Sequence, residues 1–343
     1  MTTSPKTMMA YEHQSLLREI DTYKDTVSAI VAFIHECRWD QNNRVVNGTI
    51  PFGVGRLMRN AHDDQLTPDI VIQRHPTQGV VAEVKTTFPP DNTNNRRDEV
   101  FQQLKSYDVE LFGWWSLNGQ VERHDIVLLT HDSHVVDATD HFVGLAGKEI
   151  GRFERNLAFV GFYRSEQHHS YITLRKHSGD LLDHEFSSKL RRSVPIEARH
   201  IEQQQKKFYD GCPPIPYLLS LMWTFLFPTY AEGQQRDARR GFTPVEVTSD
   251  QVTTDLQRYY GFEPDAHGNR GIPRGEWIEE ALEALVSFRM AQRGNGPRRF
   301  VIRYKGLTGD VLERFGRLFH ERREKESQRR RAPTRQPTLF DNL

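Results

Sequence analysis

The sequence predicts an α/β protein built on a mixed β-sheet with helices packed against it. Three observations indicate this class: an amphipathic segment long enough for a helix at residues 11–36, two apolar strand-like segments at 69–73 and 80–86, and a helix followed by a strand at 96–111 and 125–130. Helices and strands arranged in this order bury the apolar sides of both by packing the helices on the sheet.

The first helix is predicted by apolar side chains that recur at helical spacing. They are Leu16, Ile20, Tyr23, Val27, Ile30 and Ile34. Asn47-Gly48 and residues 51–53 (PFG) interrupt this pattern, and a strand is expected over residues 43–50. Residues 76–79 favour a turn between the two stronger strands. The order helix, three strands, helix, strand makes residues 1–150 the first expected domain.

Residues 151–240 are expected to elaborate this first domain or to connect it to the next. Segments 157–164 and 170–175 have the composition of a strand pair. Segment 213–228 is apolar and bounded by prolines, which predicts a buried helix.

Charge, cysteine content and hydropathy exclude several classes of protein. The 343 residues carry 46 Lys and Arg against 46 Asp and Glu, so no net charge draws the whole chain to nucleic acid. Two cysteines are too few for a disulfide framework or for a four-cysteine zinc or iron–sulfur site. The longest apolar run, residues 217–227, is shorter than the roughly 20 residues of a membrane span, and the polar start has no signal-peptide core. We therefore expect a cytoplasmic protein with no membrane partner.

Charged residues in two neighbouring strands provide the candidate chemistry. Asp69 follows Pro68 at the start of one strand, and Glu83 and Lys85 project from one face of the next. Charged side chains in an apolar strand are costly to bury unless they are paired. If the strands are adjacent, Asp69 comes beside Glu83, and a hard cation such as Mg²⁺ relieves the repulsion between their carboxylates. Lys85 would then hold an attacking water or a phosphate.

This arrangement resembles the PD-(D/E)xK nuclease superfamily over about residues 11–130. The restriction-endonuclease-like core of that superfamily has the same αβββαβ order. The resemblance implies that Asp69 and Glu83 ligate Mg²⁺ or Mn²⁺ with the Val84 carbonyl as a third ligand. It also implies that Lys85 is the catalytic lysine.

Two further features are similar to members of this superfamily. Residues 103–107 (QLKSY) resemble the Gln-x-x-x-Tyr signature of its recombination-exonuclease branch. Gln103 and Tyr107 share a helix face, where the resemblance implies that they brace Lys85 or contact DNA. Many members also carry a glutamate on the first helix, and the resemblance implies that it joins the metal site. Glu12 lies within the apolar stripe, Glu19 at its edge and Glu36 nearly opposite, so Glu12 is the preferred candidate. The long segment between that helix and Asp69 departs from the family pattern.

The part from 241 to 310 resembles a winged-helix module. Helices are predicted over 248–260 and 274–290, followed by a turn at 294–297 and a strand at 299–304. The expected phosphate contacts are Arg274, Arg293, Arg298 and Arg299. The second helix also carries four glutamates, which disfavour DNA, and such modules serve equally as protein-docking units. They are Glu276, Glu279, Glu280 and Glu283.

Residues 311–343 are expected to be a charged linker that ends in a short tail. The tail, QPTLFDNL, resembles the sliding-clamp-binding peptides of replication and repair proteins. Its contact residues would be Gln336, Leu339 and Phe340.

The sequence therefore predicts a Mg²⁺- or Mn²⁺-dependent DNA nuclease acting in bacterial DNA repair or anti-phage defence. One alternative is a catalytically silent DNA- or protein-binding factor in which the strand charges are structural. Another is an RNA-directed enzyme. The histidines are scattered in polar segments, and no Ser-His-Asp or metalloprotease pattern competes with these interpretations.

Overall fold

The computed structural model describes residues 5–38, 50–89, 94–115, 120–146, 152–165, 171–197, 208, 211–232, 234, 241–259 and 271–331. The chain forms two compact units. The sheet unit comprises Thr22–Gly211 and Gln257–Pro273. The C-terminal unit comprises Met1–Asp21, Cys212–Leu256 and Arg274–Leu343. Each unit is described by itself.

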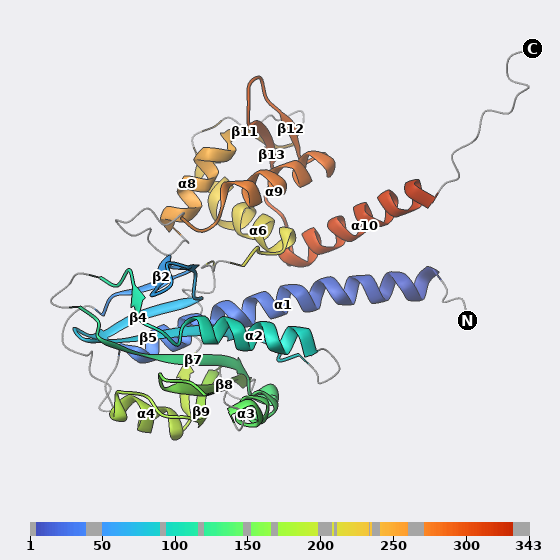
Figure 1. Ribbon diagram of the computed structural model, residues 1–343. Helices are drawn as coiled ribbons and strands as arrows, with labels where there is room; N and C mark the ends of the chain where they lie inside the picture. The colour runs from blue at the N-terminus through green and yellow to red at the C-terminus, as the bar shows by residue number, and fades with distance from the viewer. Residues whose placement is uncertain are drawn as a thin grey trace, which may run out of the picture. The chain divides into compact units, whose positions relative to one another are not determined.

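The sheet unit is built on a seven-stranded mixed sheet of order β1-β4-β5-β7-β8-β9-β10 (Figure 1). Strands β5, β7 and β8 are parallel to one another, and the remaining pairs are antiparallel. The strands are β1 Phe52–Val54, β4 Ile70–His75, β5 Gln78–Lys85, β7 Arg123–His131, β8 Leu157–Ser165, β9 Tyr171–Ser178 and β10 Val194–Glu197.

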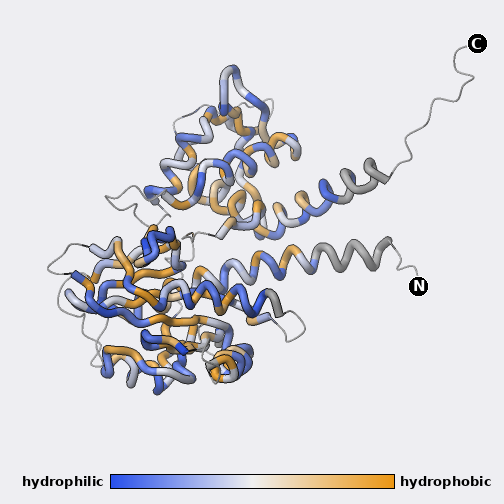
Figure 2. The backbone as a smooth tube through the Cα atoms, viewed as in Figure 1, coloured by the Kyte–Doolittle hydropathy of each residue, from blue (hydrophilic) through white to orange (hydrophobic). Residues whose placement is uncertain are grey.

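Helices cover both faces of this sheet because its buried strands alternate apolar side chains between the faces. Helices α2 (Asn94–Ser106) and α3 (Asp132–Ala146) pack on the face that carries Val81. Helix α4 (His184–Arg191) and the part of α1 (Pro5–Cys37) that belongs to this unit pack on the face of Val80 and Ala82. Figure 2 shows the alternation of polar and apolar residues along α1 that permits this packing.

A second, small sheet of order β3-β2-β6 lies in the same unit. Its strands are β2 Met58–Asn60, β3 Gln65–Leu66 and β6 Leu111–Phe112. These strands are too short for the alternation that predicts a strand from sequence. The sequence analysis missed them for that reason.

The C-terminal unit combines helices with a three-stranded antiparallel sheet of order β11-β13-β12. Trp223 lies at its centre against Phe227, Tyr304 and Phe315, and its indole N–H donates to the Lys305 carbonyl at 2.9 Å. The elements are α6 Ile215–Leu221, a π-helical turn η2 Met222–Leu226, α7 Phe227–Ala231, β11 Thr243–Thr248, α8 Ser249–Tyr259, α9 Gly275–Ser287, β12 Ala291–Arg293, β13 Arg299–Tyr304 and α10 Val311–Arg331.

The mixed α/β class and its main elements are confirmed, and two boundaries are corrected. Strands β8, β9 and β10 continue the sheet beyond residue 150, as expected for an elaboration of the first domain, but the C-terminal unit includes the chain from Cys212 and not from residue 241. The expected linker after residue 311 begins as helix α10, which continues to Arg331. Apolar side chains such as Phe315 and Phe319 anchor its first half in the unit. Of the strand expected over 43–50, residues 43–49 lie outside the described residues. No helix in the described part of the chain is long and apolar enough to cross a membrane.

Candidate active site

Asp69 and Glu83 meet across the antiparallel pair β4 and β5. Ile70 is opposite Ala82, so the next positions outward place Asp69 across from Glu83. Opposite positions in an antiparallel pair bring Cβ atoms to about 5 Å of each other. The Glu83 carboxylate acts on the Asp69 carboxyl group and raises its pKa, and Asp69 Oδ2 accepts the Val84 amide N–H at 2.8 Å. The structure therefore brings together the two acids predicted from the sequence.

Lys85 completes this cluster from the same face of β5. Its ammonium Nζ lies 2.7 Å from Glu83 Oε1. The Glu83 side chain is 3% exposed and the Lys85 side chain 29%, so the lysine lies between the buried acids and solvent. A cation that emerges from a carboxylate pair can contact an anion arriving from outside.

The electrostatics of the cluster show an excess of negative charge. Burial raises the pKa of Asp69 well above its usual range, and repulsion by Glu83 adds to the effect, although Lys85 opposes it. Burial alone would lower the pKa of Lys85, but the charges of Glu83 and Asp69 outweigh it and the pKa rises. One ammonium group thus faces two buried carboxyl groups, and a further cation beside them would favour the ionised form of Asp69.

Tyr107 and Gln103 contact the cluster from the end of α2. The Tyr107 hydroxyl donates to Glu83 Oε2 at 3.1 Å, and the Gln103 amide donates to the Tyr107 oxygen at 3.4 Å. Burial, reinforced by the Glu83 charge, raises the pKa of Tyr107, so the phenol keeps its proton and acts as a donor. These two residues fix the Glu83 side chain. No hydrogen bond joins either residue to Lys85 in the described part of the chain, so they act on Glu83 and do not brace the lysine directly.

His124 and Asp108 hold this end of α2 in place, and neither residue was predicted from the sequence. His124 Nε2 lies 2.7 Å from the Tyr107 carbonyl, and burial lowers the pKa of His124 to about 4, so its ring is neutral. Asp108 accepts the backbone N–H groups of Glu154 and Arg155 at 2.7–3.0 Å. No local pattern identifies such residues, because their partners are distant in the sequence.

Three oxygen donors of this cluster fit a hard divalent cation. They are the carboxylates of Asp69 and Glu83 and the carbonyl of Val84. In a strand the N–H and C=O of one residue point to the same side, so the Val84 carbonyl shares the side on which its N–H meets Asp69. Mg²⁺ binds through one or two carboxylates with waters and substrate oxygens completing the shell. The described residues contain no group of three or more His, Cys, Asp and Glu that could form an all-side-chain site.

Glu12 is the glutamate expected on the first helix as a further metal ligand. Glu12 lies in the part of α1 that belongs to the C-terminal unit, and its side chain is outside the described residues. Glu36, near the other end of α1, is paired with Lys189 and is buried. Glu36 has no hydrogen bond or ion pair with Asp69 or Glu83 among the described residues.

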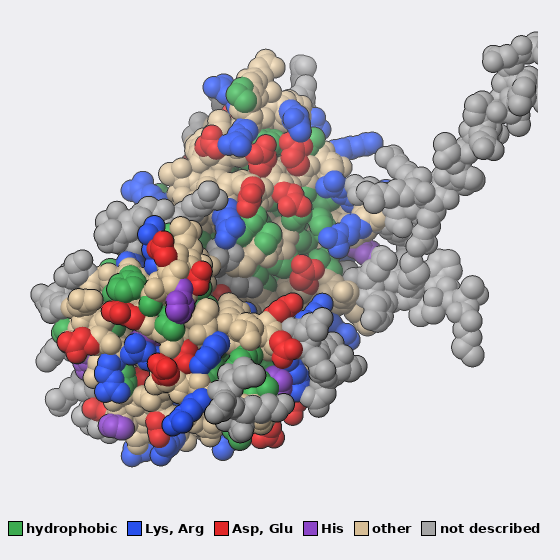
Figure 3. Space-filling view, in the orientation of Figure 1, with side chains coloured by type: hydrophobic (Ala, Val, Ile, Leu, Met, Phe, Trp, Pro, Cys, Tyr) green, Lys and Arg blue, Asp and Glu red, His purple; other side chains and the backbone are tan. Residues whose placement is uncertain are grey.

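The arginines expected to contact phosphate lie in the C-terminal unit, and two of them are paired with acids. Arg293 lies 2.9 Å from Glu283, and Arg298 lies 3.2 Å from Glu279 and 3.3 Å from Asp250. The positive charges of Arg293 and Arg298 are therefore paired with carboxylates of α8 and α9. On the face seen in Figure 3, acidic and basic side chains are interspersed in each unit.

The other two arginines are held differently. Arg274 stacks over Trp277 at 5.2 Å. Arg299 has no ion pair among the described residues and lines a groove of about 550 Å³ on the three-stranded sheet. The tail residues Gln336, Leu339 and Phe340 lie outside the described residues.

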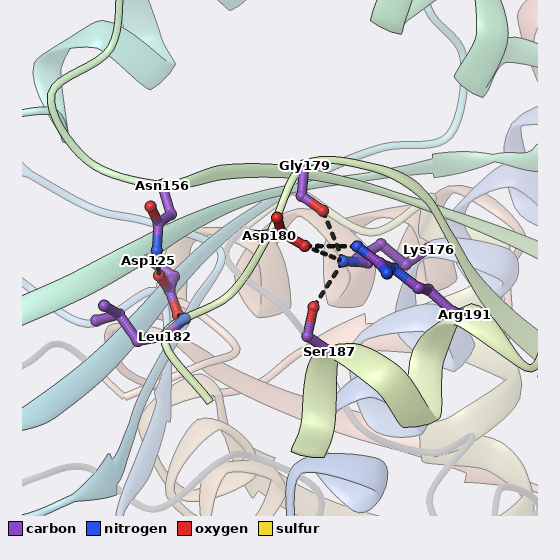
Figure 4. A network of polar contacts seen from close by, with 8 residues as sticks. All are labelled: Asp125, Asn156, Lys176, Gly179, Asp180, Leu182, Ser187 and Arg191. Carbon is purple, nitrogen blue, oxygen red and sulfur yellow. Dashed lines mark hydrogen bonds and ion pairs between the residues drawn. The ribbon is translucent and has the colours of Figure 1, made fainter. Parts of the chain in front are cut away.

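A second buried lysine could suggest a Ser–Lys nucleophile, but its contacts indicate a structural role (Figure 4). Lys176 Nζ donates to the Gly179 carbonyl at 2.6 Å, to Ser187 Oγ at 2.6 Å and to Asp180 at 3.1 Å. All three ammonium hydrogens therefore have acceptors. In the same network Asp125 accepts from Asn156 and the Leu182 amide, and burial raises the pKa of Asp125 to about 6.

Comparisons with known proteins assign no family to the chain. No protein-family model matches it, and neither a curated protein nor a solved structure matches it. The function is therefore argued from the arrangement of Asp69, Glu83, Lys85 and Tyr107.

Proposed function

We propose that this chain is a Mg²⁺-dependent deoxyribonuclease of the PD-(D/E)xK type that hydrolyses phosphodiester bonds. The observation that carries the proposal is the buried Asp69–Glu83 pair on adjacent strands, with the Lys85 ammonium group 2.7 Å from Glu83. With the strands of the small sheet left aside, the main sheet follows the order α1, β1, β4, β5, α2, β7, in which β1, β4 and β5 are antiparallel neighbours and β7 is parallel to β5. This order is the one expected for the αβββαβ core of the superfamily that the sequence resembles, and it supports the proposal.

Each residue has a distinct role in the proposed reaction. Asp69, Glu83 and the Val84 carbonyl would hold Mg²⁺ or Mn²⁺, which lowers the pKa of bound water and neutralises phosphate charge. Lys85 would donate to a non-bridging phosphate oxygen or orient the attacking water. Tyr107, held by Gln103, keeps Glu83 in its rotamer through the 3.1 Å hydrogen bond. His124 stays neutral and fixes the backbone that carries Tyr107.

A cleavage assay tests the proposal directly. The purified chain is incubated with single-stranded DNA, double-stranded DNA and RNA in Mg²⁺, Mn²⁺ or EDTA. We expect metal-dependent cleavage of DNA, reduced by roughly 10³-fold in Asp69→Asn and in Lys85→Ala. Asp63→Asn, which neutralises an exposed acid, is the matched control and should cut at the wild-type rate. Equal cleavage by all variants would refute the site, and a preference for RNA would change the substrate class.

A second candidate function rests on the C-terminal unit, which we propose to be a winged-helix module. Its order β11, α8, α9, β12, turn and β13, with sheet order β11-β13-β12, supports this interpretation. Because Arg293 and Arg298 are paired with acids of α8 and α9, the unit is better suited to docking a protein than to reading DNA through α9. DNA binding by wild type in EDTA without later cleavage in Mg²⁺ would favour a silent binding factor.

The proposed tether to a sliding clamp and the place in repair or phage defence depend on the tail. Deletion of residues 336–343 should abolish co-elution with a clamp while leaving metal-dependent cleavage unchanged. Unchanged co-elution would remove the tether from the proposal.

A further inference from the structure

A buried hydroxyl lies beside the candidate site without a partner. Thr130 is fully buried at the end of β7, and its Oγ1 has no hydrogen-bond partner among the described residues. A buried polar group that forms no hydrogen bond lowers the stability of the folded state. Valine has nearly the same shape and would avoid the cost of burying an unpaired hydroxyl group. The presence of threonine at this position therefore suggests that the hydroxyl group has a functional role.

Its register places Thr130 next to Lys85. Strands β5 and β7 are parallel, with Lys85 directly paired with Thr130. Neighbouring strands are about 4.8 Å apart, and paired residues project to the same face. Thr130 shares the face of Ile126 and Leu128, which pack with α2 in one core, and this is also the face of Glu83 and Lys85. The hydroxyl and the stem of Lys85 are therefore adjacent.

The chemistry of the site suggests that this hydroxyl group accepts a hydrogen bond from Lys85. Lys85 Nζ is 2.7 Å from Glu83 Oε1, which is also one of the oxygens available to a divalent cation. If Glu83 bound a divalent cation, its Oε1 atom would be less available to accept a hydrogen bond from the Lys85 ammonium group. A threonine oxygen accepts hydrogen bonds, and a lysine side chain is flexible enough to change partners.

We propose that Thr130 is a positioning residue that accepts a hydrogen bond from Lys85 when Glu83 holds the metal ion. It keeps the ammonium directed at the phosphate instead of at the carboxylate. The inference rests on the proposed nuclease function and deepens it. The Thr130 hydroxyl group, which lacks a partner among the described residues, would then receive a hydrogen bond from Lys85 during the reaction.

Three variants at this position separate a positioning role from packing. Thr130→Val removes the hydroxyl, Thr130→Ser retains it, and Thr130→Ala differs from Thr130→Ser by the hydroxyl alone. Thr173→Val, at a buried threonine of β9, is the matched control. Cleavage is measured as kcat and KM, and metal-free thermal unfolding is measured in parallel.

We expect Thr130→Val to unfold at or above the wild-type temperature in EDTA while its kcat falls about tenfold at unchanged KM. Thr130→Ser should retain most of the wild-type kcat. Lysine-selective NMR adds a readout independent of activity: the Lys85 signal, assigned by its loss in Lys85→Ala, should shift with Mg²⁺ in wild type and Thr130→Ser and shift differently in Thr130→Val.

Wild-type kcat in Thr130→Val would overturn the inference while leaving the nuclease function intact, as would an equal loss in Thr130→Ser. If Thr130→Val does not fold, equal kcat values for Thr130→Ser and Thr130→Ala would overturn it. Failure of the nuclease proposal is a different result: Asp69→Asn and Lys85→Ala would cut like wild type.

Discussion

Two lysines of the same sheet differ in how their ammonium groups are satisfied. Lys176 on β9 is 1% exposed and donates to a carbonyl, a hydroxyl and a carboxylate. Lys85 on β5 is 29% exposed and donates to Glu83, with the second acid Asp69 in the same cluster. An ammonium group whose three N–H donors all have acceptors stabilises the fold. An ammonium group that lies near solvent beside two acids is available to bind a substrate.

The acids around the two lysines differ in the same sense. The hydrogen bond from Lys176 lowers the pKa of Asp180, which stays ionised at the surface. Burial and Glu83 raise the pKa of Asp69 instead. The ammonium group of Lys176 has an acceptor for each of its N–H donors, whereas Asp69 and Glu83 share the single ammonium group of Lys85.

The largest expected effect separates the two lysines by activity. Lys85→Met should reduce metal-dependent DNA cleavage by roughly 10³-fold, because it removes the cation that faces the phosphate. Lys176→Met should leave kcat near the wild-type value at a temperature where the variant is folded. Comparable losses in both variants would show that the contrast between the lysines is not functional.

The second prediction concerns stability, and here the larger effect is expected at Lys176. Lys176→Met removes the donor of three hydrogen bonds and leaves Ser187 and the Gly179 carbonyl without it. We expect the free energy of unfolding to fall by about 1–3 kcal/mol. Urea unfolding followed by circular dichroism measures this change, and Lys325→Met, at an exposed lysine of α10, is a control for loss of a surface lysine. A neutral effect would contradict the structural role of Lys176.

The third prediction concerns the pH dependence of stability in EDTA. The pKa of Asp69 is higher in the folded protein than in the unfolded chain, so the folded state binds more protons, and stability falls as pH rises above about 4. Asp69→Asn should reduce this slope. Asp125 adds a slope of the same sign that ends near pH 6, where its raised pKa lies, so Asp125→Asn serves for comparison.

Mg²⁺ should oppose the same trend, since the cation binds the ionised carboxylates and stabilises the folded state more at higher pH. Thermal unfolding from pH 4 to 8, with and without Mg²⁺, measures both effects. A wild-type slope unaffected by Asp69→Asn would show that the two acids do not compete for a proton.

The smallest effect is expected at the rim of the Lys176 network. Arg191 pairs with Asp180 at 2.7 Å, and both side chains are more than 60% exposed. Surface ion pairs of this kind contribute little to stability. Arg191→Gln should therefore leave both the unfolding temperature and cleavage at wild-type values. A clear loss of stability would show that the network depends on its exposed charges as well as on its buried ones.

The acids and the lysine of the candidate site were predictable because their signal is local. Alternation in a strand puts Glu83 and Lys85 on one face, and spacing by four puts Gln103 and Tyr107 on one side of a helix. The partners of these residues were not predictable in the same way. Tyr107 binds Glu83 and not Lys85, and His124 and Asp108 support it through contacts with distant segments.

Apolar periodicity and motif spacing were sufficient for the class of fold, its main helices and strands, and the residues Asp69, Glu83 and Lys85. Both depend on side chains a few positions apart. Long-range pairing decided the extension of the sheet through β8 to β10, the place of Thr130 beside Lys85, and the contrast between Lys85 and Lys176. Hydrogen-bond satisfaction and burial arise only when distant segments meet, so a lysine in a strand shows its role only after the chain has folded.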